Sequence, residues 1–126
     1  MKQKYIIGDL VKYKVGGLEF IAEITNTSKY GYCFKGVSDD ISGTLCKEFA
    51  KDIPLTPEIL EKNGWKKSLR PYSKYSWYRR KGYPTLNIRS ENEILFYWGD
   101  HNENITTVHK LQHLLFGLNI NSEMEV

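Results

Sequence analysis

Closely spaced turn residues divide the first fifty residues into short segments, and this spacing restricts the fold more than any other feature. Gly8-Asp9, Gly16-Gly17 and the polar stretches at 26–29 and 38–40 are turn signals. Alternating or β-branched and aromatic residues fill the intervals, as is typical of strands. The predicted strands lie at 10–15, 18–24, 30–35 and 41–46. Strands this short and this close together predict a small, bent β-meander.

The stretch "IPLTPEILEKNGW" carries the clearest helix signal. Thr56 is a favourable N-cap, Pro57 suits the first helical position, and Gly64 suits the left-handed residue that ends a helix. Trp65 can then pack back onto the last turn. We therefore expect a short connecting helix from Pro57 to Asn63.

The rest of the chain predicts a sheet followed by a helix. The predicted strands lie at 76–80, 85–89 and 93–98, the predicted polar loop at 99–104 and the predicted helix at 107–116. Gly117 is the expected helix stop, and Met124 and Val126 could belong to one more strand. The helix carries an apolar stripe of Val108, Leu111, Leu115 and Leu118. We expect this stripe to pack against the sheet residues Leu86, Ile88, Ile94 and Phe96.

These elements together predict an α+β fold in a single domain, residues 1–126. A β-meander lobe covers 1–52, and residues 53–126 form the connecting helix and an antiparallel sheet covered by the C-terminal helix. The opening "GDLVKY", with its Gly-Gly turn and "AEI", resembles the start of many SH3-like barrels, so the meander is expected to be a partial barrel of that kind.

A second resemblance covers about residues 53–126. The order of "IPLTPEILEKNGW", aromatic strands, "VHKLQHLLFGL" and "NSEMEV" is similar to a family of small uncharacterised proteins of gut bacteria, prophages and phages. That family has no known activity. The resemblance implies a small accessory protein, encoded on a phage or a bacterial chromosome.

Charge is distributed unevenly along the chain. The segment from Lys62 to Arg89 contains nine basic residues and no acidic one, although the chain has 18 basic and 15 acidic residues in total. A contiguous basic block in a chain whose remainder is acidic indicates an anionic partner.

Within that block, "RPYSKYSWYRRKGYP" interleaves basic and aromatic side chains. Arginine makes forked contacts to phosphate, and aromatic rings stack on bases. The sequence thus predicts a non-catalytic site for a phosphate-bearing ligand, either a nucleotide-type molecule or a single-stranded nucleic acid. The candidate ligand-binding residues are Arg70, Tyr75, Trp77, Arg79, Arg80 and Lys81.

Two other interpretations of this stretch stay open. In a strand from Ser76 to Arg80, Trp77 and Arg79 share one face and Tyr78 and Arg80 the other, so one aromatic residue must enter the core. The basic residues would then only form a solvated face. Alternatively, the same Trp, Tyr and Arg side chains are the contact residues of a protein-interaction module, because these types are enriched in interface hot spots.

His109 and His113 lie four residues apart on the predicted helix and could share a metal ion, with His101, Glu123 or Glu125 as a third ligand. Lys110 stands where the H-E-x-x-H hydrolases have their general base. A metal-dependent enzyme using His109 and His113 is therefore only a remote alternative. The main expectation is a protein without metal, cofactor or catalytic activity.

No apolar run has the length of about 20 residues that spans a bilayer. The two cysteines stand alone, and the first residues lack the features of a signal peptide. We therefore expect a cytoplasmic protein without membrane contact, and its exposed strands are compatible with a homodimer.

Overall fold

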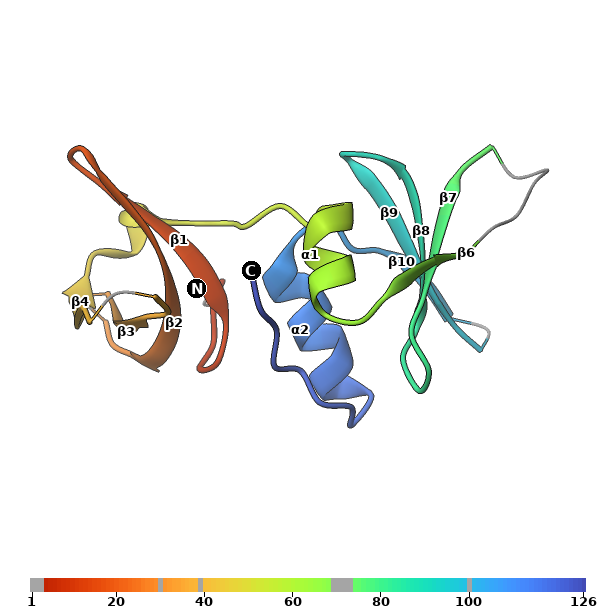
Figure 1. Ribbon diagram of the computed structural model, residues 1–126. Helices are drawn as coiled ribbons and strands as arrows, with labels where there is room; N and C mark the ends of the chain where they lie inside the picture. Colours follow the sequence, from red (N-terminus) through yellow and green to blue (C-terminus); the bar gives the residue numbers. More distant parts are fainter. Residues whose placement is uncertain (1–3, 30, 39, 69–73, 100) are drawn as a thin grey trace. The chain divides into compact units, whose positions relative to one another are not determined.

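The computed structural model describes residues 4–29, 31–38, 40–68, 74–99 and 101–126 (Figure 1). The fold is α+β, as expected, with two antiparallel sheets and two α-helices among these residues. The chain divides into two compact units, Met1–Ile53 and Pro54–Val126.

The first unit is a meander of short antiparallel strands. Among the described residues its order is β4-β3-β2-β1-β5. The strands are β1 (Leu10–Val15), β2 (Leu18–Thr27), β3 (Tyr32–Gly36), β4 (Ser42–Leu45) and β5 (Ala50–Lys51), and the 3₁₀ helix η1 (Lys47–Phe49) precedes β5. The predicted strands thus form, with β5 in addition.

An aromatic cluster fills the core of this unit. The ring centroid of Tyr13 lies 5.6 Å from that of Phe20 and 4.8 Å from that of Phe34. Such aromatic pairs contribute roughly 0.5–1.5 kcal/mol beyond the area they bury. The core is therefore built by alternate residues of β1, β2 and β3, as the period of two in the sequence predicts.

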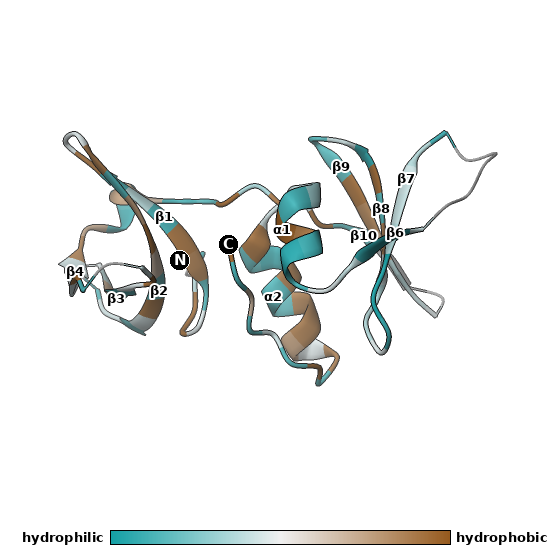
Figure 2. Cartoon of the chain, viewed as in Figure 1, coloured by the Kyte–Doolittle hydropathy of each residue, from teal (hydrophilic) through white to brown (hydrophobic). Residues whose placement is uncertain are grey.

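The second unit has a sheet of order β10-β9-β8-β7-β6 among the described residues. Its strands are β6 (Lys66–Ser68), β7 (Ser76–Arg79), β8 (Thr85–Ser90), β9 (Glu93–Trp98) and β10 (His101–Asn104), and its helices are α1 (Pro57–Lys62) and α2 (Val108–Gly117). Figure 1 shows both helices on the same side of this sheet. Figure 2 shows that β9 and much of α2 are hydrophobic, whereas β6 is hydrophilic.

The core of the second unit contains residues from the predicted apolar stripe and from the predicted sheet face. Leu118 and Ile88 are only partly buried. The fully or almost fully buried members are Val108, Leu111, Leu115, Leu86, Ile94 and Phe96. The period of 3.6 in the helix and of two in the strands therefore identified most of this core.

The connecting helix ends as its sequence predicts. The hydroxyl of Thr56 accepts a hydrogen bond from the Ile59 amide, and Gly64 has a φ of +95°. Trp65 follows at once and is buried, with its amide donating to the Leu60 carbonyl.

Four details differ from the predictions. The predicted loop at 99–104 is wrong, because His101–Asn104 forms a strand that pairs with β9. This strand lies at the edge of the sheet and is held by backbone hydrogen bonds, so it carries no apolar pattern that a prediction could use. Strand β6 was not predicted for the same reason.

The expected terminal strand is also wrong, since 119–126 forms no strand, and Asn63 instead binds the backbone of Glu125. Helix α2 ends at Gly117, as predicted. The residue with a left-handed backbone after the helix is Asn119, with a φ of 59°, and not Gly117.

Candidate functional site

Strand β7 is at the centre of the basic-aromatic segment, and its alternation decides which aromatic side chain enters the core. Tyr78 is only 3% exposed and pairs with Leu86, whose neighbour on β9 is Phe96. Trp77 and Arg79 therefore lie on the opposite face of the sheet. We call this opposite face, which carries Trp77, Asn87, Leu95 and Tyr97, the outer face.

Adjacent strands bring one row of residues together across the outer face. Trp77 is paired with Ser68 on β6 and with Asn87 on β8, and Asn87 is paired in turn with Leu95 on β9. Leu95 pairs with Asn104 on β10. All five strands of this sheet thus contribute neighbouring residues to one surface.

Two contacts involve aromatic rings of the basic-aromatic segment. The Trp77 and Tyr97 ring centroids are 5.4 Å apart with the planes tilted by 34°, and both side chains are partly exposed. The Arg89 guanidinium lies 4.9 Å from the centre of the Tyr75 ring, which is 39% exposed. Aromatic planes with exposed area are what a base needs for stacking.

Lys66 and Arg79 face each other directly on the outer face, as partners in neighbouring strands. Both side chains are exposed, and among the described residues neither forms an ion pair. Like charges placed directly opposite each other destabilise a sheet. An anion bound between them would remove that repulsion.

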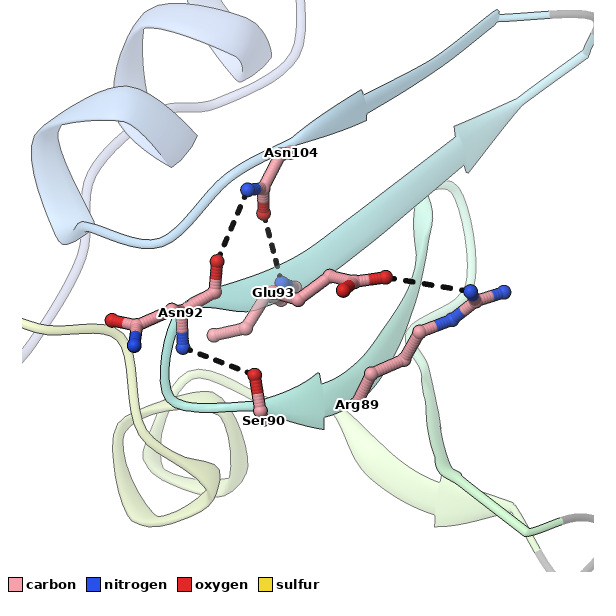
Figure 3. Close-up of polar contacts among 6 residues, drawn as sticks. Arg89, Ser90, Asn92, Glu93 and Asn104 are labelled. Atoms are coloured by element: carbon pink, nitrogen blue, oxygen red, sulfur yellow. Dashed lines mark hydrogen bonds and ion pairs between the residues drawn. The ribbon is translucent and has the colours of Figure 1, made fainter.

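The turn between β8 and β9 is held by polar side chains (Figure 3). Arg89 forms an ion pair of 3.4 Å with Glu93, and Asn104 joins β10 to this turn through the Ile94 amide and the Asn92 carbonyl. Arg89 is therefore partly neutralised, whereas Lys66 and Arg79 have no acidic partner in the part of the chain that the structure describes.

The structure separates the six predicted ligand-binding residues. Trp77 and Arg79 belong to the outer face, and Tyr75 immediately precedes β7 with its ring against the Arg89 guanidinium. Lys81 is exposed in the β7–β8 turn, and Arg70 lies outside the described residues.

Arg80 lies in a different environment from Arg79. Strand β7 ends at Arg79, and the Arg80 guanidinium lies 3.8 Å from the centre of the Tyr83 ring and 5.2 Å from that of Trp65. The Trp65 indole donates to the Pro84 carbonyl at 3.1 Å. Arg80 also lines an open groove of about 500 Å³ with residues 62–64 and the segment 121–125. Its contacts are those of a packing residue, which the sequence did not predict.

Asn87 is the residue of the outer face that sequence reasoning missed. It is 1% exposed, and neither its amide nitrogen nor its amide oxygen has a hydrogen-bond partner among the described residues. Leaving a buried polar group unpaired costs about 1–3 kcal/mol. The available signal was an asparagine in the middle of a β-forming segment, "TLNIR", where this residue type is depleted.

The two histidine rings of α2 lie against each other, and one of them also contacts Thr107. His109 is buried with its Nδ1 atom 3.2 Å from the Thr107 hydroxyl, and the centroid of its ring lies 5.6 Å from that of His113. No group of three or more side chains suited to hold a metal occurs in the described part of the chain.

Neither α-helix among the described residues has the length and apolar character that a membrane span requires. In comparisons with known proteins, no family model, no curated protein and no solved structure matches the chain.

Proposed function

We propose that the outer face binds a phosphate-bearing ligand that also carries a base, either a single-stranded nucleic acid or a nucleotide-type molecule. The observation that carries this proposal is the directly opposed pair of exposed cations, Lys66 and Arg79, next to Trp77. A phosphate between the two cations would be held by charge-assisted hydrogen bonds. The neighbouring rings of Trp77 and Tyr97 would offer stacking area to the attached base.

The arrangement of this sheet supports the same proposal. Both helices lie on one side of it (Figure 1), and Trp77 and Tyr97 on the outer face are in contact and partly exposed. A sheet with stacking aromatics on its uncovered face is a recurrent platform for single-stranded RNA. Such a role is that of a non-catalytic accessory protein, which the resemblance to bacterial and phage proteins also implies. For the first unit, we propose an SH3-like barrel, since β5 follows a 3₁₀ helix and pairs with β1.

Direct titration tests the proposal. Fluorescence anisotropy with labelled oligo(dT), and competition by free nucleoside monophosphates, would be measured at low salt for the parent and for the double variant Lys66→Gln, Arg79→Gln. We expect the double variant to bind at least about tenfold more weakly, because charge-assisted contacts contribute roughly 1.5–3 kcal/mol each. Competition by a free nucleotide would identify a small-molecule site, and its absence would identify a strand-binding site.

Lys35→Gln is the matched control. Lys35 is likewise exposed in a strand, but its partner on the neighbouring strand is the acidic Glu23 and not a second cation. This control should bind as the parent does. Equal binding by the parent and the double variant, or no binding by the parent, contradicts the proposal and favours a protein-interaction surface.

A further inference from the structure

Asn87 stands in the central strand of its sheet, in the middle of the outer face. Trp77 is its partner on one side and Leu95 on the other. Its amide is buried and has no hydrogen-bond partner among the described residues, although the Asn104 amide, at the end of the same row, has two. Buried polar groups in folded proteins are almost always paired, so an exception calls for a physical explanation.

The aromatic pair beside Asn87 indicates what kind of group could pair with it. An asparagine amide offers one donor and one acceptor side by side. A nucleobase offers the complementary donor and acceptor on its edge, together with a flat face for stacking. Adenine presents such a pair at N6 and N7, which is the edge that asparagine reads in other nucleic-acid complexes.

We propose that Asn87 is a specificity-determining residue that reads the edge of one base, preferring adenine, while that base stacks on Trp77 or Tyr97. This inference rests on the proposed function and adds the identity of the base. In the free protein the amide has no partner within the described part of the chain, and the bound base supplies both hydrogen bonds.

Access to Asn87 requires a movement of a neighbouring ring. Asn87 is 1% exposed, whereas Trp77 and Tyr97 are partly exposed. The base therefore reaches the amide when the Trp77 side chain turns away from Tyr97 and stacks on the base instead. Binding should thus change the tryptophan emission of the parent, and the Trp77→Phe variant should lose most of that change.

The decisive test combines base preference with stability in the variant Asn87→Leu. Affinities for oligo(dA), oligo(dC) and oligo(dT) and for AMP and CMP would be measured, together with the melting temperature. The parent should prefer the adenine ligands by about tenfold, and Asn87→Leu should bind all ligands about equally. The variant should also melt roughly 4 °C higher, because a leucine of similar shape removes two unpaired polar atoms from the interior.

Asn104→Leu is the matched control, because its amide is already hydrogen-bonded to the Ile94 amide at 2.9 Å and to the Asn92 carbonyl at 3.1 Å. This variant should melt lower than the parent and keep the preference for adenine. A higher melting temperature for Asn87→Leu and a lower one for Asn104→Leu would show that Asn104 stabilises the fold and that Asn87 does not.

Each contrary result has a distinct meaning. If the parent binds all oligonucleotides within about twofold, the proposed function stands and the role of Asn87 is wrong. If Asn87→Leu melts lower than the parent or fails to fold, the amide has a structural role and the inference is also wrong. If the parent binds no nucleotide or oligonucleotide, both the proposed function and the inference fail.

Discussion

The Arg80 guanidinium lies 3.8 Å from the centre of the Tyr83 ring, whereas the preceding residue, Arg79, is exposed and stands opposite Lys66 on the neighbouring strand. Two adjacent arginines of one basic run therefore have different surroundings. The strand ends between them, so they need not alternate in a regular way.

Single substitutions should separate the two arginines. Arg79→Gln should leave the melting temperature almost unchanged, since exposed changes shift stability by only about 0.5 kcal/mol, but it should weaken ligand binding. Arg80→Gln should lower stability by roughly 0.5–1 kcal/mol through the lost cation–π contacts and bind nearly as the parent does. Thermal melts and anisotropy titrations check both. The reverse pattern would assign the ligand to the Arg80 groove.

Two tryptophans provide a second comparison. Trp77→Ala should weaken binding about tenfold or more, because base stacking contributes roughly 1–3 kcal/mol. Trp98 is 37% exposed, and strand alternation places it on the other face of β9 from Tyr97. Trp98→Ala should therefore keep the affinity of the parent in the same titration. A larger loss for Trp98→Ala would show that the outer face is not the binding surface.

The salt dependence of binding should report on the opposed cations. For a single strand, each neutralised phosphate contributes about −0.7 to the slope of log K against log salt, so one phosphate held between Lys66 and Arg79 predicts about −0.7. The double variant Lys66→Gln, Arg79→Gln should lose this contact, and its slope should become less steep by about 0.7. Anisotropy titrations over a range of salt concentrations measure both values. A slope near zero would instead fit an aromatic protein interface.

Asn63 should hold the end of the described chain against α1. Its side-chain nitrogen donates to the Ile59 and Glu125 carbonyls, and its oxygen accepts from the Glu125 amide, each at 2.7 Å. Asn63→Ala should abolish hydrogen-exchange protection of the Glu125 amide and cost about 1 kcal/mol or more. Lys62→Ala removes only the bond to the Val126 carbonyl and should keep that protection. Protection that persists in Asn63→Ala would contradict this role.

Tyr13 should make the first unit sensitive to alkali. Burial raises the pKa of its hydroxyl to about 12, and this hydroxyl has no hydrogen-bond partner among the described residues. The unfolded chain releases this proton near pH 10 and the folded chain near pH 12, so stability is complete below about pH 10 and falls as the pH rises toward 12.

The variant Tyr13→Phe tests this pH dependence. It removes both the titration and an unpaired polar atom, so it should be at least as stable as the parent at neutral pH and lose less stability above about pH 10. Denaturant unfolding at several pH values measures the difference. Burial also raises the pKa of Tyr5, so some alkaline loss should remain in the variant. An unchanged pH profile would contradict the assignment to Tyr13.

Local signals in the sequence predicted most of the elements. The cap at Thr56, the left-handed Gly64 and the stripe from Val108 to Leu115 depend on residues within a few positions of one another. Turn residues and a period of two likewise identified strands β1 to β4 of the first unit. Strands β5, β6 and β10 were not predicted, because their pairing depends on a neighbouring strand and not on a run of apolar residues of their own.

The sequence by itself determined that this chain is an α+β protein with a contiguous basic and aromatic segment. Only the tertiary structure decided how that segment is divided. It buried Tyr78, left Trp77 and Arg79 on the outer face, placed Arg80 against Tyr83, and brought Lys66, Asn87 and Tyr97 beside them from other strands. The physical reason is register, because cross-strand hydrogen bonds select which distant residues become neighbours, and no local pattern encodes that choice.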